Sequence, residues 1–312
     1  MSDYHTPVLF EESLSALVTN PSGLYIDATF GGGGHTAGIL SRLSQSGKVL
    51  AFDRDTDAIA NRPDDSRLTL IHNNFRFVEN YVLLEGRKEG DPALKADGIL
   101  ADLGVSSHQF DTAERGFSFR FDAPLDMRMD SVGTRRTAAD IVNGSTREDL
   151  ERILRLYGEV DKPGKVAQLI VKARESARIT TTVQLNAALA PVLPKNAEHK
   201  VLAKIYQALR IEVNQEMRSL EKFLEGAAAS LRTGGRLVVI TYHSLEDRMV
   251  KNFIRTGNTE GIVRTDVYGR TSAPLSPVNR KPILPGEEEI ASNTRARSAK
   301  LRVASRNMGG RK

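Results

Sequence analysis

One stretch decides the fold of this chain: Tyr25-Ile-Asp-Ala-Thr-Phe-Gly-Gly-Gly-Gly-His-Thr36. An apolar, β-prone run reaches Asp27, and four consecutive glycines then lead into a helix-like segment at 36–44. Glycine at a strand-to-helix turn lets the backbone take positive φ and approach a ligand closely. The stretch therefore predicts a ligand-binding turn that follows the first strand of an α/β sheet.

A second apolar run, 48–53, ends in another acid, Asp53. An acid at the tip of the second strand suits the two hydroxyls of a ribose. The two runs together predict a nucleoside-containing cofactor across the carboxyl ends of the first two strands. Asp27, within its strand, favours S-adenosylmethionine (SAM), because SAM carries cationic sulfonium and amino groups that a dinucleotide lacks.

Other ligands remain alternatives for a glycine-rich turn. The spacing Gly32-x-Gly34-x-x-Ala37 loosely fits the dinucleotide-binding fingerprint, which is a weak signal by itself. An NAD-dependent oxidoreductase is therefore an alternative, although no Tyr-x-x-x-Lys pair is present for hydride transfer. A phosphate loop is disfavoured, because no Gly-Lys-Ser/Thr follows the glycines. A turn without a ligand is disfavoured by the chain entropy that four glycines cost.

Composition narrows the class of protein. The 312 residues suit one large domain or two modest ones, and a hydrophobic content of 40% supports a core. No apolar run approaches the roughly 20 residues of a membrane span. The start, Met1-Ser-Asp-Tyr-His5, lacks the pattern of a signal peptide, so we expect a cytoplasmic protein without membrane contact.

The absence of cysteine excludes several kinds of chemistry. Disulfides, thiolate metal sites and a cysteine nucleophile are all ruled out. Methylation at carbon 5 of a pyrimidine normally needs a cysteine adduct, so it is disfavoured too. The six histidines show no metal-ligand spacing, and we expect no metal.

Positive charge gathers near the C-terminus. The net charge is +5, yet residues 264–312 hold eleven Lys or Arg against four Asp or Glu. Seven basic residues follow the last acid, Glu289. Such a tail could simply solubilise the terminus, but phosphate binding is favoured if the substrate is a nucleic acid.

Strand-like and helix-like runs alternate along the chain and predict a parallel, doubly wound α/β sheet with helices on both faces. The expected strands are 24–28, 48–53, 67–71, 96–102, 236–242 and 300–305, the last at an edge of the sheet. The expected helices of this domain are 8–17, 36–44, 55–61, 75–84, 212–232 and one from 244, and 272–285 is expected to be a proline-rich loop.

A purely helical region interrupts this pattern. Apolar residues recur at helical spacing in 147–157, 165–177, 183–193 and 201–210. The sequence therefore predicts one discontinuous domain, 1–105 and 213–312, and a helical insertion at 106–212.

Polar residues at two further strand ends are candidates for chemistry. Asp102 ends the fourth strand, where it could accept hydrogen bonds from an exocyclic amine and align the lone pair of that amine with a sulfonium methyl. His243 follows the fifth strand and could position a base or a phosphate, or accept a proton. Ser244 is expected to cap the next helix, with Asp247 completing a capping box.

An aromatic loop is a candidate for contact with single-stranded bases. Gly116-Phe-Ser-Phe-Arg-Phe-Asp122 combines three aromatic residues with an arginine. Exposed aromatic rings beside arginine can stack single-stranded bases. The alternative is a small hydrophobic cluster that ties the insertion to the sheet.

Eight strings, in order, resemble the RsmH (MraW) family of bacterial 16S ribosomal RNA cytosine-N4 methyltransferases. They are His5-Thr-Pro-Val-Leu, Asp27-Ala-Thr-Phe-Gly-Gly-Gly-Gly-His, Asp102-Leu-Gly-Val-Ser-Ser, Gly116-Phe-Ser-Phe-Arg, Leu125-Asp-Met-Arg-Met, Gln207-Ala-Leu-Arg-Ile-Glu-Val-Asn214, His243-Ser-Leu-Glu-Asp-Arg and Arg295-Ala-Arg-Ser-Ala-Lys-Leu-Arg302. The resemblance covers residues 5 to about 306. Tyr242 stands where the family leads us to expect Phe, a departure expected to alter packing but not the reaction class.

The resemblance implies a class I SAM-dependent methyltransferase fold in which the insertion recognises RNA. It implies methyl transfer to the N4 of a cytidine in the decoding region, on 16S rRNA in the small ribosomal subunit or a late assembly particle. By position, the cofactor contacts it implies are Gly33, Gly34, His35, Asp53, Phe75, Asp102 and Gln109, of which Phe75 and Gln109 come from the resemblance alone. A non-catalytic RNA-binding assembly factor is the alternative, and a homodimer stays open.

Overall fold

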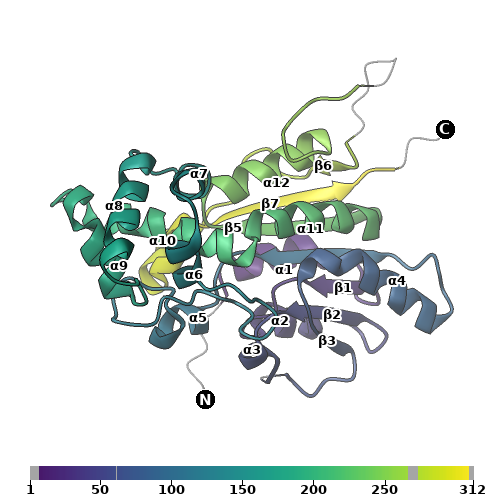
Figure 1. Cartoon of the computed structure of the whole chain (residues 1–312). Helices are drawn as coiled ribbons and strands as arrows, with labels where there is room; N and C mark the ends of the chain where they lie inside the picture. Colours follow the sequence, from purple (N-terminus) through teal and green to yellow (C-terminus); the bar gives the residue numbers. More distant parts are fainter. Residues whose placement is uncertain (1–6, 61, 266–272, 309–312) are drawn as a thin grey trace. The chain divides into compact units, whose positions relative to one another are not determined.

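A computed structural model of the chain describes residues 7–60, 62–265 and 273–308 (Figure 1). The chain divides into two compact units. The sheet unit consists of Met1–Gly104 and Arg218–Lys312, and the insertion consists of Val105–Met217. The start of the first family string, His5-Thr6, and the last two basic residues of the tail lie outside the described residues.

The sheet unit is built on seven strands in the order β3-β2-β1-β4-β5-β7-β6. Neighbouring strands from β3 to β5 are parallel, whereas β7 runs antiparallel to both β5 and β6. This is the α/β, Rossmann-like architecture that the sequence predicted. The strands are β1 Leu24–Asp27, β2 Lys48–Asp53, β3 Leu68–His72, β4 Ala96–Asp102, β5 Leu231–Thr241, β6 Leu275–Pro277 and β7 Lys300–Arg306.

Helices cover both faces of the sheet. Successive side chains of a strand point to opposite faces, so a single strand can pack against helices on both sides. The helices α1 and α2 share one buried cluster with Val49 of β2, whereas Phe52 of the same strand packs edge-on against Tyr81 of α4, with ring centroids 5.3 Å apart. The helices of the unit are α1 Phe10–Leu17, α2 Gly34–Arg42, α3 Thr56–Ala60, α4 Val78–Glu89, α11 Glu216–Ser230, α12 Ser244–Thr256 and α13 Glu287–Ser292.

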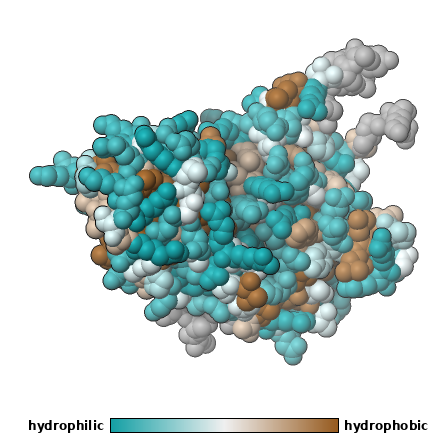
Figure 2. All heavy atoms as spheres, viewed as in Figure 1, coloured by the Kyte–Doolittle hydropathy of each residue, from teal (hydrophilic) through white to brown (hydrophobic). Residues whose placement is uncertain are grey.

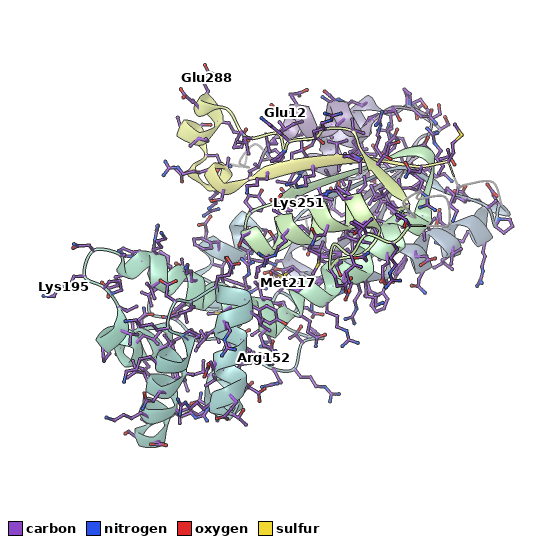
Figure 3. All side chains as sticks on the ribbon, turned by 90° about the horizontal axis from the view of Figure 1, so that it is seen from above. Glu12, Arg152, Lys195, Met217, Lys251 and Glu288 are labelled. Atoms are coloured by element: carbon purple, nitrogen blue, oxygen red, sulfur yellow. The ribbon has the colours of Figure 1, made fainter. Side chains whose placement is uncertain are left out.

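The insertion is helical and has its own core. Thr137, Thr146 and Thr181 cap the starts of three helices with their side-chain oxygens, which fixes where those helices begin. Arg152 and Lys195 belong to this unit (Figure 3). Its helices are α5 Ser107–Asp111, α6 Ala138–Gly144, α7 Arg147–Gly158, α8 Pro163–Ser176, α9 Thr182–Leu189 and α10 Glu198–Asn214, and its buried core includes Leu150, Ile153, Ile170, Leu185 and Leu209.

The structure corrects two predictions about the C-terminal part. The segment 300–305 does not lie at an edge of the sheet, because β7 pairs with β5 on one side and with β6 on the other. The strand β6 lies inside the segment expected to be a proline-rich loop. With only three residues, it is too short for a periodic pattern to reveal it.

Hydrophilic residues cover most of the face drawn in Figure 2, and hydrophobic residues appear there in small separate patches. Among the described helices, none combines the length and the apolar character needed to cross a membrane.

Candidate functional site

The site lies at the carboxyl edge of the sheet unit, where β1, β2, β3 and β4 end side by side because they are parallel. The buried carboxylate of Asp27 organises this edge. Its Oδ1 accepts a hydrogen bond from the backbone N–H of Thr29 at 3.0 Å, and its Oδ2 accepts one from Oγ1 of Thr36 at 2.7 Å. Burial raises the pKa of Asp27, and these hydrogen bonds act against that rise. Asp27 thus ties the first strand to the start of α2.

Glycine is required at two positions of the turn. Gly33 has φ of +78°, and a Cβ atom there would lie 2.9 Å from Cζ of Phe30. A Cβ atom on Gly34 would lie 2.4 Å from Cγ of Pro7. Because α2 begins at Gly34, the N–H groups of its first turn have no acceptor within the helix and lie at the positive end of its dipole. This turn can therefore bind a negatively charged group of a ligand.

The carboxylate of Asp53 joins the end of β2 to the glycine turn. Its Oδ2 accepts a hydrogen bond from the N–H of Gly31 at 2.7 Å, and its Oδ1 accepts one from the N–H of Asp55 at 2.8 Å. Burial raises the pKa of Asp53. A carboxylate oxygen has two lone pairs, so the Asp53 carboxylate can also accept a hydrogen bond from a ligand hydroxyl.

Phe75 follows β3 in a short 3-10 turn, Phe75–Phe77. The sequence predicted an α-helix over 75–84, but α4 begins only at Val78. Its half-buried ring packs edge-on against Phe223 of α11, with centroids 5.2 Å apart. This packing fixes the ring plane. The part of the ring that stays exposed can stack on a planar ligand.

Asp102 ends β4 and is held from two sides. Its Oδ1 accepts a hydrogen bond from the hydroxyl of Tyr242 at 2.8 Å, and its backbone N–H donates to Oγ1 of Thr29 at 2.7 Å. Burial raises the pKa of Asp102 to about 6, although His35 and the Tyr242 hydrogen bond both lower it. The side chain is therefore ionised at neutral pH, yet close enough to its pKa to take up a proton.

His35 lies next to this carboxylate. Its side chain is 5% exposed, and its Nδ1 is 3.8 Å from Oδ2 of Asp102. Burial lowers the pKa of His35, so the ring is neutral at neutral pH. Its Nε2 is buried without a hydrogen-bond partner among the described residues. The structure therefore brings two predicted site residues together, one from the glycine turn and one from β4.

His243 has a local role that the sequence assigned to Ser244. It is the residue that caps α12: its Nδ1 accepts the N–H of Glu246 at 3.4 Å, while Oε2 of Glu246 accepts the N–H of His243 at 3.3 Å. The prediction that Ser244 and Asp247 form this capping box is wrong. Asp247 instead binds Arg302 of β7, with Oδ1 2.7 Å from Nε.

Two predicted groups belong to the insertion. Gln109 is buried in α5, where its Oε1 accepts the N–H of Ser106 in a capping box. The aromatic loop is divided: Phe117 is buried in the core of the insertion, Phe119 packs against Tyr206, and Phe121 is 50% exposed. The loop thus contributes mainly to the hydrophobic core of the insertion itself, and one ring remains exposed.

Two residues of the site were not found from the sequence. The hydroxyl of Tyr242 reaches Asp102, although the departure from Phe was expected to affect packing alone. Glu246 is 4% exposed and also accepts the N–H of Tyr242 through Oε2 at 2.9 Å. The string His243-Ser-Leu-Glu-Asp-Arg248 contained this acid, but nothing in its spacing distinguished it from Asp247.

These residues fit a nucleoside cofactor that carries an amino-acid tail. The first turn of α2 offers N–H groups to a carboxylate, Asp53 offers lone pairs to hydroxyls, and the ring of Phe75 offers a stacking surface. All of them belong to the sheet unit. Asp102 lies next to His35 at the same edge, and its carboxylate can accept a hydrogen bond from the group that reacts with the cofactor.

Comparison with known proteins identifies the family of the chain. The model of the MraW methylase family matches residues 2–307. The chain is 50% identical over 303 residues to Ribosomal RNA small subunit methyltransferase H of Parabacteroides distasonis, covering 97% of each chain, and 51% identical over 302 residues to the protein of that name from Bacteroides fragilis, covering 96% of this chain and 97% of that one. A solved rRNA methylase from Streptococcus thermophilus superposes over 96% of this chain and 94% of that chain, with a TM-score of 0.40 and 13% identity. The chain therefore belongs to the MraW methylase family, whose members are SAM-dependent methyltransferases.

Proposed function

We propose that this methyltransferase modifies small-subunit ribosomal RNA, at the exocyclic N4 of a cytidine in the decoding region of 16S rRNA. The names of the relatives support the class of substrate. The observation that carries the proposal for an amine is the carboxylate of Asp102 at the end of β4, ionised and held by Tyr242. The absence of cysteine argues against the covalent route to carbon 5 of a pyrimidine.

The chemistry of an exocyclic amine explains why a carboxylate is needed. The lone pair of this nitrogen is delocalised into the ring, so the amine is a weak nucleophile and its orientation limits the rate. Asp102 accepts a hydrogen bond from the N–H and turns the lone pair toward the methyl group. When bound, SAM supplies that methyl group, and its C–S bond breaks as the N–CH3 bond forms. The nitrogen then loses one proton, which Asp102 or solvent accepts.

The remaining residues of the site hold the cofactor in this proposal. Gly34 and His35 present backbone N–H groups to its carboxylate, Gly33 lets the backbone approach it closely, and Asp53 binds the ribose hydroxyls. Phe75 stacks on the adenine. Gln109 is a further cofactor contact in this proposal, and His243 orients the base or a phosphate. Both ring nitrogens of His243 contact Glu246, and these contacts fix the orientation of the imidazole.

The insertion is the proposed RNA-recognition unit. Lys195 and Lys200 are exposed near the start of α10, and Phe121 exposes half of its ring. Lys195 points away from the neighbouring helices in Figure 3. Basic side chains and exposed aromatic rings are the elements with which proteins hold single-stranded RNA.

One experiment tests the proposal directly. Small subunits and free 16S rRNA from a strain that lacks this protein are incubated with the purified protein and SAM, digested and mapped by mass spectrometry. We expect N4-methylcytidine at a single position of the decoding region. Methyl groups at carbon 5 or on a ribose would refute the assignment to N4, and the absence of any methyl group would refute the activity on this RNA.

A further inference from the structure

Tyr242 places a hydroxyl on the carboxylate of Asp102. The phenol oxygen is 2.8 Å from Oδ1, and the two residues are 140 positions apart in the sequence. Burial, followed by the negative charge of Asp102, raises the pKa of Tyr242 well above its ordinary value. The hydroxyl therefore stays protonated at any pH at which the protein works, and it always acts as the donor.

The position of Tyr242 is fixed by its surroundings. Its backbone N–H donates to Oε2 of the buried Glu246 at 2.9 Å, which ties it to the first turn of α12. The preceding residue, Thr241, pairs with Lys300 of β7. The ring packs against the cluster that α1 and α2 form with the sheet. The hydroxyl is thus delivered to Asp102 from a rigid frame.

The two oxygens of Asp102 are therefore not equivalent. Oδ1 accepts from Tyr242, whereas Oδ2 accepts no hydrogen bond from the described residues and faces Nδ1 of His35 at 3.8 Å. We infer that Tyr242 is a positioning residue for methyl transfer: its hydroxyl fixes the carboxylate through Oδ1 and leaves Oδ2 to accept the N–H of the substrate amine. This inference rests on the proposed function of Asp102.

The charges around Asp102 make this hydrogen bond important for its ionisation. Asp27 of β1 and Glu246 of α12 are negative and raise the pKa of Asp102, together with its burial. His35 of α2 and the hydroxyl of Tyr242 lower it. Since burial makes His35 neutral, Tyr242 is the stabilising donor that persists at neutral pH. Removal of its hydroxyl should leave more of Asp102 protonated.

The test is Tyr242→Phe, which deletes a single oxygen atom. The titration of the Asp102 carboxyl carbon is followed by NMR in protein labelled with 13C-aspartate, and its signal is assigned with Asp102→Asn. We expect the midpoint to rise by about one pH unit, as for the loss of a hydrogen bond to a charged acceptor. In single-turnover methylation of the RNA at saturating SAM, the midpoint of the acid limb of the pH–rate profile should rise by the same amount, and the rate at pH 6 should fall about fivefold, because the ionised fraction of Asp102 falls from about a half to about a tenth.

Tyr25→Phe is the matched control. Tyr25 is also buried in the sheet unit, and its hydroxyl is hydrogen-bonded to the backbone of Thr19 and Asn20 and not to Asp102. This control should leave the Asp102 midpoint unchanged, and thermal melting verifies that both variants are folded. An unchanged midpoint in Tyr242→Phe would overturn the inference whether or not the protein methylates the RNA. Methylation of another atom by the wild-type protein would instead refute the proposed function.

Discussion

The N–H of Gly31 donates to Oδ2 of Asp53 at 2.7 Å, so one carboxylate joins the glycine turn to the end of β2. The residue proposed to bind the ribose also holds the turn proposed to bind the other end of the cofactor. A substitution at this position should therefore affect both parts of the cofactor site.

Asp53→Ala should weaken SAM binding about tenfold to a hundredfold, because charge-assisted hydrogen bonds contribute about 1.5–3 kcal/mol each. Isothermal titration calorimetry measures the dissociation constant. Asp53→Asn, which keeps one acceptor oxygen, should give an intermediate value. If SAM binds Asp53→Ala as tightly as the wild-type protein, the ribose is held elsewhere.

Asp102→Ala should lower the methylation rate by more than it weakens the binding of RNA, since the alignment of the amine matters most in the transition state. In the wild-type protein, the rate should rise as pH passes through about 6, where Asp102 becomes ionised. Single-turnover rates at saturating SAM and RNA measure both effects, and calorimetry checks SAM affinity. Rates within twofold of wild type would remove Asp102 from the mechanism.

Asp102→Asn should stabilise the fold above pH 6 while it lowers activity. The pKa of Asp102 is raised from 3.8 to about 6, so the native state favours the neutral acid and stability falls as pH rises between these values. By linkage, the ionisation of Asp102 lowers the free energy of unfolding by up to about 3 kcal/mol above pH 6. Asparagine does not ionise and avoids this loss. Urea unfolding at pH 4.5 and 8 should show a larger gain at pH 8. An equal difference at both pH values would contradict the ionisation argument.

Asp247→Ala should lower the free energy of unfolding by about 3 kcal/mol. The largely buried guanidinium of Arg302 would lose the carboxylate that balances its charge, and little water could replace it. The two side chains are 15% and 11% exposed, and Nε and Nη2 of Arg302 contact Oδ1 and Oδ2 at 2.7 and 3.1 Å. Urea unfolding measures the loss. Asp65→Ala breaks a more exposed ion pair with Arg67 within one loop, and its smaller loss serves as the comparison.

Charge reversal of Arg295 and Arg297 should weaken RNA binding and flatten its salt dependence. Both side chains are exposed before β7. Each lost phosphate contact changes the slope of log K against log salt by about 0.7 for single strands, so the double variant should change it by about 1 to 1.5. The matched control reverses Arg87 and Lys88, exposed on α4, and should leave the slope unchanged. An unchanged slope in both variants would leave the insertion as the RNA-binding unit.

The comparison of sequence and structure shows which interactions leave a local signal. The strands β1, β2 and β4 were predictable because buried parallel strands are apolar runs, and the glycine turn because its backbone demands glycine. The cap of α12 was assigned to Ser244, since histidine is not among the residues preferred at this position. The hydrogen bond between Tyr242 and Asp102 links the ends of β5 and β4, which the whole insertion separates in the sequence. No local sequence pattern predicts a contact between residues 140 positions apart.

The place of β7 in the sheet has a consequence for biosynthesis. Since this strand lies between β5 and β6, the sheet cannot be completed until residue 306 has been synthesised. The insertion depends on local contacts among successive helices and can fold earlier, as N-terminal parts of nascent chains do. A polypeptide that stops short by a few dozen residues would expose the edge of β5, including Ile240 beside Asp102, to other chains. Premature termination should thus yield aggregates, not a weakly active enzyme.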